Sequence, residues 1–365
     1  RDRKLPLPGK LMDNNLSLMR LLAALGVLFG HSFNLALGLG GHPGPISQAI
    51  DFYTPFNIGF PGVCVFIFFT ISGFLVTKSF CSRANIIDFI EARVIRIYPA
   101  AIVAIAFTAF VVGTAFTTLE TREYLSHSNV ITYFLKYILL LDINFHVPGV
   151  FKDNPRPGGV NGSLWTLPVE IRMYLIVLFF GIFLILKKSE VFNAVFLILI
   201  LIYVASPENF MLLENPRHIY LFMPFLTGMM FYVNRDWLKL KVYYAVLSFP
   251  VLIILFDTSW YDFLASIWLS FTVLAVGFTK KISLLDVDRL GDFSYGTYLY
   301  AFPVQQSLVF MYGIESPWLL FLIASCVTFI LAILSWFFIE KPALSMKGMS
   351  SKFIASEKSR FSKNV

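Results

Sequence analysis

The chain has 365 residues, of which 57% are apolar and only 14% are charged, whereas a soluble domain carries about 25% charged residues. These values, with a mean hydropathy of +0.73, exclude an ordinary soluble globular protein, a disordered chain and a disulfide scaffold, and they favour a helical bundle embedded in lipid. The net charge of +7 does not indicate nucleic-acid binding, because long apolar segments interrupt the basic residues and leave no continuous basic groove.

Ten apolar segments are predicted to cross the membrane, for which a helix needs about 20 residues. In chain order they are 16–37, 57–78, 97–116, 164–186, 190–206, 217–234, 242–256, 262–279, 293–312 and 318–339. An eleventh apolar segment, 131–145, contains Lys136 and Asp142, and its length favours an interfacial or re-entrant position. The predicted fold class is an all-α integral membrane protein with about ten transmembrane helices.

The basic residues predict the orientation of these helices. With both termini in the cytoplasm, 22 Lys and Arg residues fall in inside segments and 5 in outside segments, as the positive-inside rule requires. We therefore expect a multi-pass protein of the inner (plasma) membrane. Its parts are a basic cytoplasmic tail at 1–15, a transmembrane domain at 16–340 with an outside loop at 117–163, and a second basic tail at 341–365.

Two polar residues within the first segment are the first candidate catalytic residues. Arg20 and His31 are eleven residues apart, so they share one face of a helix and are separated by about 16.5 Å along its axis. Taken singly, Arg20 could extend toward lipid phosphates and His31 could be a neutral imidazole bonded to a neighbouring helix. Together they suit a polar channel, in which His31 could take a proton from a hydroxyl group.

Arg93 and Arg96 form the second constellation, at the cytoplasmic end of the third segment. Arginines three residues apart lie on one side of a helix and make a two-armed cationic site suited to phosphates. Anchoring by the positive-inside rule is an equally good explanation of this pair.

The third constellation opens the fourth segment from outside. Glu170 could orient His31 or bind sugar hydroxyls, and the alternative is an ion pair with a cation on another helix. Trp165 could stack on a sugar ring or belong to the interfacial aromatic belt. Trp165 and Asn161 are the candidate substrate-binding residues.

Two weaker motifs complete the candidate site. Ser72 and Gly73 lie near the cytoplasmic end of the second segment, and Tyr295 lies at the start of the ninth. They could line a cofactor tunnel, although helix packing by small residues explains them equally well. The three cysteines, Cys64, Cys81 and Cys326, have no metal-binding spacing, and no metal is predicted.

With these residues in place, the chain resembles the acyltransferase family 3 membrane proteins. The matching motifs run from the first segment to the last. They are Asn15-Leu-Ser-Leu-Met-Arg20 with His31, Ile71-Ser-Gly-Phe, Arg93-x-x-Arg96-Ile-Tyr-Pro, Ser163-Leu-Trp-Thr-Leu-Pro-Val-Glu170, Ser294-Tyr-Gly-Thr-Tyr-Leu-Tyr and Trp336-Phe-Phe-Ile-Glu-Lys-Pro342.

The resemblance implies transfer of an acyl group, usually acetyl, from cytoplasmic acyl-CoA to a carbohydrate at the outer face of the inner membrane. It implies that Arg20 and His31 are essential and that Arg93 and Arg96 engage CoA. The ninth segment departs from the family pattern: relatives often read Tyr-x-His-Phe-Pro, whereas this chain reads Tyr300-Ala301-Phe302-Pro303, so no role for a histidine is transferred there.

The residues and the resemblance together predict an O-acyltransferase that uses acetyl-CoA as its donor, a carbohydrate as its acceptor and the lipid bilayer as its environment, with no nucleic acid. In this hypothesis His31 is the general base that Glu170 orients. A transporter or glycan flippase is the alternative, because intramembrane charges can also line a substrate path.

Overall fold

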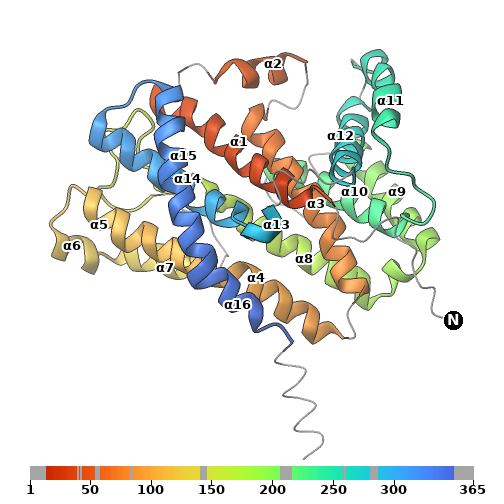
Figure 1. The fold of residues 1–365 in the computed structure, drawn as a ribbon, viewed down its shortest axis with the longest axis horizontal. Helices are drawn as coiled ribbons and strands as arrows, with labels where there is room; N and C mark the ends of the chain where they lie inside the picture. The colour runs from red at the N-terminus through yellow and green to blue at the C-terminus, as the bar shows by residue number, and fades with distance from the viewer. Residues whose placement is uncertain are drawn as a thin grey trace, which may run out of the picture. The chain divides into compact units, whose positions relative to one another are not determined.

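The computed structural model describes residues 14–348, apart from 39–40, 42, 54–57, 83–84, 140–145, 206–215, 257, 259 and 280–286. All regular elements within these described residues are helices (Figure 1). Most of the first predicted tail (1–15) and most of the second (341–365) lie outside this part of the chain. In the second tail, α16 (Lys341–Ser345) is described, and it extends the last helix five residues beyond the predicted boundary at 340.

Within the described part of the chain, five helices are long and apolar enough to cross a membrane, and the chain is therefore a membrane protein. They span Leu16–Leu37, Gly59–Cys81, Ile86–Phe116, Gly162–Ile182 and Pro317–Ser345. Four shorter apolar helices occupy the fifth to eighth predicted segments: Ser189–Ala205, Tyr220–Val233, Val242–Ile254 and Tyr261–Gly277. The all-helical membrane class is confirmed, whereas the count of ten spans and the location of the termini stay predictions.

The third long helix begins eleven residues before the predicted segment. Asn85 caps it, because its side chain accepts a hydrogen bond from the backbone N–H of Asp88 at 2.8 Å. The first turns are amphipathic, so hydropathy alone placed the start at residue 97. The helix comprises α4 (Ile86–Ala106), a π-helical segment (Phe107–Val112) and α5 (Gly113–Phe116).

The helices fall into two compact units. Unit 1 comprises Arg1–Ala23, Ala49–Ser82 and Val169–Asp292, and unit 2 comprises Ala24–Gln48, Arg83–Pro168 and Phe293–Val365. Three helices belong partly to each unit: α1 (Leu16–Leu37), α2 (Pro45–Tyr53) and α8 (Thr166–Ile182).

Unit 1 is assembled around α3 (Gly59–Cys81). This helix packs along α10 (Pro216–Val233), and α12 (Tyr261–Gly277) packs on both. The remaining helices of the unit are most of α8 (Thr166–Ile182), α9 (Ser189–Ala205), α11 (Val242–Ile254) and α13 (Val287–Leu290).

Glycines set the closeness of the α3–α10 contact. A Cβ atom on Gly73 would overlap the carbonyl oxygen of Phe225, and a Cβ atom on Gly228 would overlap that of Thr70. Close backbone approach of this kind is typical of small residues in membrane helices.

Unit 2 is assembled around α14 (Ser294–Tyr312), which lies alongside α15 (Pro317–Ser335). A second π-helical segment (Trp336–Glu340) joins α15 to α16, and α16 lies against α4 (Figure 1). The segment predicted as interfacial, 131–145, overlaps α7 (Ser128–Leu139), a 12-residue helix that follows α6 (Thr121–Ser126), and its residues 140–145 lie outside the described residues.

Candidate active site

Helix α14 is enclosed by protein along most of its length. Every residue from Ser294 to Val309 is buried. A polar side chain anywhere on this stretch must therefore find a partner inside unit 2 or leave a costly unpaired group. The polar residues of α14 identify two clusters, one at its start and one in its middle.

The first cluster brings two candidate cofactor-binding residues together. The Tyr295 hydroxyl donates a hydrogen bond to the carbonyl of Ile97 at 3.0 Å, and the Arg96 guanidinium lies 5.5 Å from the centre of the Tyr295 ring. The buried carboxylate of Glu340 lies 3.7 Å from Arg96. Arg93 lies one turn earlier on α4. This end of α14 is therefore cationic and aromatic, with Glu340 as a partner that the sequence analysis did not identify.

The second cluster surrounds His31. The imidazole meets the edge of the Phe302 ring, with 5.3 Å between ring centres. The Gln305 amide donates to the carbonyl of Leu28 at 2.8 Å and to the Ser32 hydroxyl at 2.7 Å. Within the described residues, the buried Nδ1 atom of His31 makes no hydrogen bond. The packing around His31 therefore leaves the hydrogen-bonding capacity of this nitrogen unused by the described residues.

One face of α14 connects the two clusters. Phe302 and Gln305 follow Tyr295 by seven and ten residues. At about 100° per residue, the three side chains lie within about 80° of one another around the helix. The helical rise gives about 15 Å between the first and the last of them. The cationic cluster and His31 thus belong to a single unit and lie along a single helix.

The loop predicted to lie outside, 117–163, is anchored on the same helix by Gln306, the residue next to Gln305. The Asn154 amide donates to the Gln306 side-chain oxygen at 2.8 Å, and the Gln306 amide donates to the carbonyls of Gly159 at 2.7 Å and Arg156 at 3.1 Å. Two consecutive glutamines in an apolar segment were a signal that the sequence analysis passed over, because buried amides need partners.

The candidate acceptor residues lie just beyond this anchored loop. Asn161 is fully buried; its amide donates to the carbonyl of Leu299 at 3.0 Å, and its oxygen accepts from the N–H of Ser163 at 3.2 Å. These bonds explain Asn161 as an anchor of the short helix that begins at Gly162 and ends at Trp165. Contact of Asn161 and Trp165 with substrate stays a prediction.

Arg20 has a partner that the sequence analysis did not identify. Its guanidinium lies 2.7 Å from the carboxylate of Asp292, and each side chain is about one-fifth exposed. Since α1 is unbroken from Leu16 to Leu37, the spacing of Arg20 and His31 does place them on one helix face. The Asp292 pairing is not the lipid-phosphate contact that was one alternative for Arg20.

The other candidate residues lie in unit 1. Glu170 accepts a hydrogen bond from the hydroxyl of Tyr174, one turn later on α8, and its contact with His31 stays a prediction. Gly73 lies in the α3–α10 contact, where packing accounts for it, and Ser72 precedes it on α3. Within the described residues, no group of three or more His, Cys, Asp or Glu could hold a metal ion.

Helical membrane architecture, an unpaired buried imidazole and a cationic cluster along one helix together fit an acyltransferase of the membrane-embedded kind. Residues 13–337 match the family model described as an acyltransferase domain, so the chain belongs to this family and is an acyltransferase. The resemblance inferred from the motifs is confirmed.

Two curated relatives cover nearly the whole chain. An O-acetyl transferase of Shigella phage Sf6 is 30% identical over 349 residues, which are 89% of this chain and 94% of that protein. Nodulation protein 10 of Rhizobium leguminosarum bv. viciae is 28% identical over 367 residues, covering 92% of this chain and 94% of that protein. No solved structure matches the chain.

Proposed function

We propose that the protein transfers an acyl group, most simply acetyl, from cytoplasmic acyl-CoA to a hydroxyl group of a carbohydrate at the outer face of the inner membrane. Ten transmembrane helices with both termini in the cytoplasm would carry this reaction. The concentration of Lys and Arg in the predicted inside segments supports this orientation. The O-acetyl transferase of the phage supports acetyl as the group transferred.

The observation that carries the proposal is the face of α14 that joins the Arg96 cluster to His31. Arg93 and Arg96 would hold the phosphates of CoA, since guanidinium groups bind phosphate through paired hydrogen bonds. Tyr295 supports Arg96 from α14. The thioester arm would then extend along this face toward His31.

His31 would act as the general base. Its ring nitrogen takes the proton from the acceptor hydroxyl while the hydroxyl oxygen attacks the thioester carbonyl. The carbon–sulfur bond breaks, the ester forms, and the CoA sulfur leaves with the proton that His31 returns. Glu170 would orient the base or the acceptor, and Trp165 and Asn161 would contact the acceptor ring. Direct transfer and a covalent acyl-enzyme fit these residues equally.

The test uses the purified protein in liposomes with radiolabelled acetyl-CoA and a carbohydrate acceptor. A transferase converts the thioester to free CoA and a labelled ester, whereas a transporter or flippase leaves the thioester intact. Replacing the base in His31→Ala should reduce transfer by at least about 100-fold. His127→Ala, a histidine on the loop between α6 and α7, is the matched control. An intact thioester, or full activity in His31→Ala, would overturn the proposal.

A further inference from the structure

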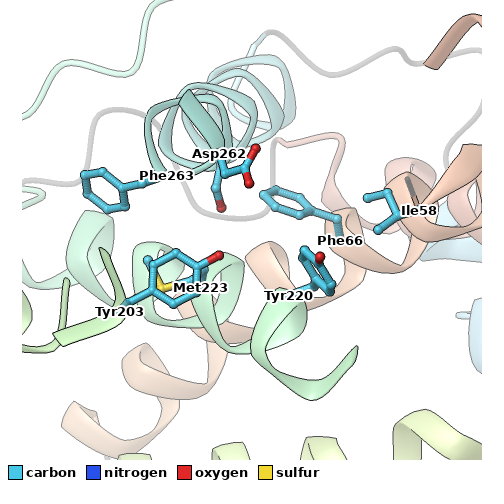
Figure 2. A pocket seen from close by; sticks show the side chains of 8 residues that line it. Ile58, Phe66, Tyr203, Tyr220, Met223, Asp262 and Phe263 are labelled. Carbon is cyan, nitrogen blue, oxygen red and sulfur yellow. The ribbon is translucent and has the colours of Figure 1, made fainter. Parts of the chain in front are cut away.

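A small pocket lies within unit 1, where one end of each of four helices comes together (Figure 2). Its volume is about 20 Å³, which is room for one water molecule or one hydroxyl group. The lining side chains are Ile58, Phe66, Tyr203, Tyr220, Met223, Asp262, Phe263 and Ser266. None of them belongs to the site described above.

Two polar groups in this pocket make no hydrogen bond within the described residues. They are the buried carboxylate oxygen Oδ1 of Asp262 and the hydroxyl of Ser266, whose side chain is 5% exposed. The two residues are one turn apart on α12 and therefore face the same side. Unpaired buried oxygens cost free energy, so a hydroxyl group of a ligand, or a water molecule in its absence, would supply the missing hydrogen bonds in this pocket.

Aromatic rings form the opposite wall. Figure 2 shows Asp262 on one side of the pocket and the rings of Tyr203 and Tyr220 on the other, with Phe66 beside them. Tyr220 is 37% exposed, so its side chain reaches from the pocket lining to the surface of the unit. The lining thus offers flat apolar rings, an anionic acceptor and a hydroxyl group.

This combination selects the ligand class. A saccharide ring has apolar C–H faces that lie against aromatic rings and hydroxyl groups that donate to a carboxylate in strong, charge-assisted hydrogen bonds. The CoA donor fits poorly, because its phosphates would be repelled by Asp262 and the pocket lining contains no Lys or Arg. A metal ion would have a single carboxylate ligand here.

The position of the pocket at the ends of four helices also supports a role in binding the acceptor. The pocket is built from the first turns of α3, α10 and α12 and the last turns of α9. In the orientation given by the basic residues, all four ends lie at the outer face, where the proposed acceptor arrives.

We propose that this pocket is a saccharide-binding subsite in which Asp262 and Ser266 hold one hydroxyl group of the acceptor while Tyr203 and Tyr220 pack on its ring. The inference rests on the proposed function, because that function supplies the carbohydrate and the side of the membrane.

The first experiment measures steady-state kinetics of the full chain in liposomes with acetyl-CoA and methyl glycosides of common hexoses. Asp262→Asn keeps the size of the side chain and removes its charge, and we expect the KM for the glycoside to rise about tenfold while the KM for acetyl-CoA does not. Asp236→Asn, an exposed residue of the same unit, is the matched control. An unchanged glycoside KM in Asp262→Asn would overturn the inference and leave the proposed function standing.

A second experiment does not depend on catalysis. Binding of the same methyl glycosides to the purified protein is measured by saturation-transfer NMR for the wild type, Ser266→Ala and the control Ser248→Ala, which changes an exposed serine on α11. We expect weaker binding in Ser266→Ala alone. If the wild type binds glycosides through this pocket but transfers no acetyl group, the proposed function fails and the saccharide site stands. Equal binding in all three proteins, or binding of sodium ions in place of glycosides, would overturn the inference.

Discussion

The His31 cluster of unit 2 and the Asp262 pocket of unit 1 differ in the amide groups that they contain. Around α14, the side-chain NH2 groups of Gln305, Gln306 and Asn161 each donate to protein acceptors at 2.7–3.4 Å. Both regions also contain buried polar atoms that make no hydrogen bond within the described residues: His31 Nδ1 in the cluster, and Asp262 Oδ1 and the Ser266 hydroxyl in the pocket. Paired amides therefore hold α14 in place, and each region keeps polar atoms whose hydrogen bonds a ligand could supply.

Position in each unit explains this contrast. Helix α14 is enclosed, so a polar residue on any of its faces meets another part of unit 2. Helices α9 and α11 of unit 1 expose large apolar side chains, including Leu197, Leu247 and Ile254, and such surfaces suit lipid.

The largest expected effect tests the glycine contact of unit 1. Gly73→Leu would force a side chain into the backbone of Phe225 on α10, where no flexible atom can move aside. We expect the protein to be lost from the membrane fraction, as measured by size-exclusion chromatography of the detergent-solubilised chain.

The matched control for this prediction is Ala205→Leu, which adds similar volume at an exposed position of α9. Wild-type yield and elution of Gly73→Leu would show that the two helices do not approach this closely, and it would strengthen the cofactor role of Gly73 against the packing role.

The next effect tests the amide network of unit 2. Gln306→Leu removes the acceptor of Asn154 and the donor to two loop carbonyls, which leaves several buried groups unsatisfied. We expect a loss of about 2–4 kcal/mol in stability, seen as a melting temperature lowered by several degrees in detergent. Gln48→Leu, an exposed glutamine of α2, should leave the melting temperature unchanged. Equal melting of the two variants would contradict the anchoring role.

A smaller effect concerns the ion pair of Arg20 and Asp292. Both side chains are about one-fifth exposed, so their coupling is weaker than that of a fully buried pair. A double-mutant cycle with Arg20→Ala and Asp292→Asn, read as thermal stability, should give a coupling of about 1–2 kcal/mol. Simple additivity of the two variants would mean that Arg20 is held by lipid rather than by Asp292.

The sequence predicted the positions of long apolar helices well, but it did not predict which residues the buried polar side chains contact. Hydropathy placed the first segment at 16–37, where α1 lies, because one helix of the right length and composition encodes its own boundaries. Hydropathy missed the start of α4 at Ile86, because it does not detect helical turns that contain charged residues and precede the apolar segment. Of the segment 131–145, only 131–139 are described, as part of α7, and its interfacial or re-entrant position stays a prediction.

For the candidate site too, the sequence predicted features within one helix but not contacts between distant segments. Spacing along one helix was enough to put Arg20 and His31 on one face of α1. The pairs Arg20–Asp292 and Leu28–Gln305 join residues more than 270 positions apart. No local pattern encodes such a pairing, so Asp292, Gln305 and the Asp262 pocket required coordinates.

The smallest expected effect lies in the outside loop and depends on pH. The Tyr124 hydroxyl donates to the carbonyl of Ala109 in the π-helical segment at 2.7 Å, and burial raises the pKa of Tyr124 to about 12. Loss of this hydrogen bond in Tyr124→Phe should cost about 1 kcal/mol at neutral pH. Thermal melting in detergent, compared with Tyr312→Phe at an exposed position of α14, measures this cost.

The raised pKa also fixes the direction of the pH dependence. The unfolded chain releases the Tyr124 proton near pH 10, whereas the folded protein keeps it up to about pH 12. The stability contributed by the protonated hydroxyl is therefore complete below pH 10 and is lost as the pH rises from about 10 to 12. Tyr124→Phe cannot titrate, so its melting temperature should fall less steeply over this interval than that of the wild type. Parallel curves would place Tyr124 in contact with water and remove its contribution to the π-helical segment.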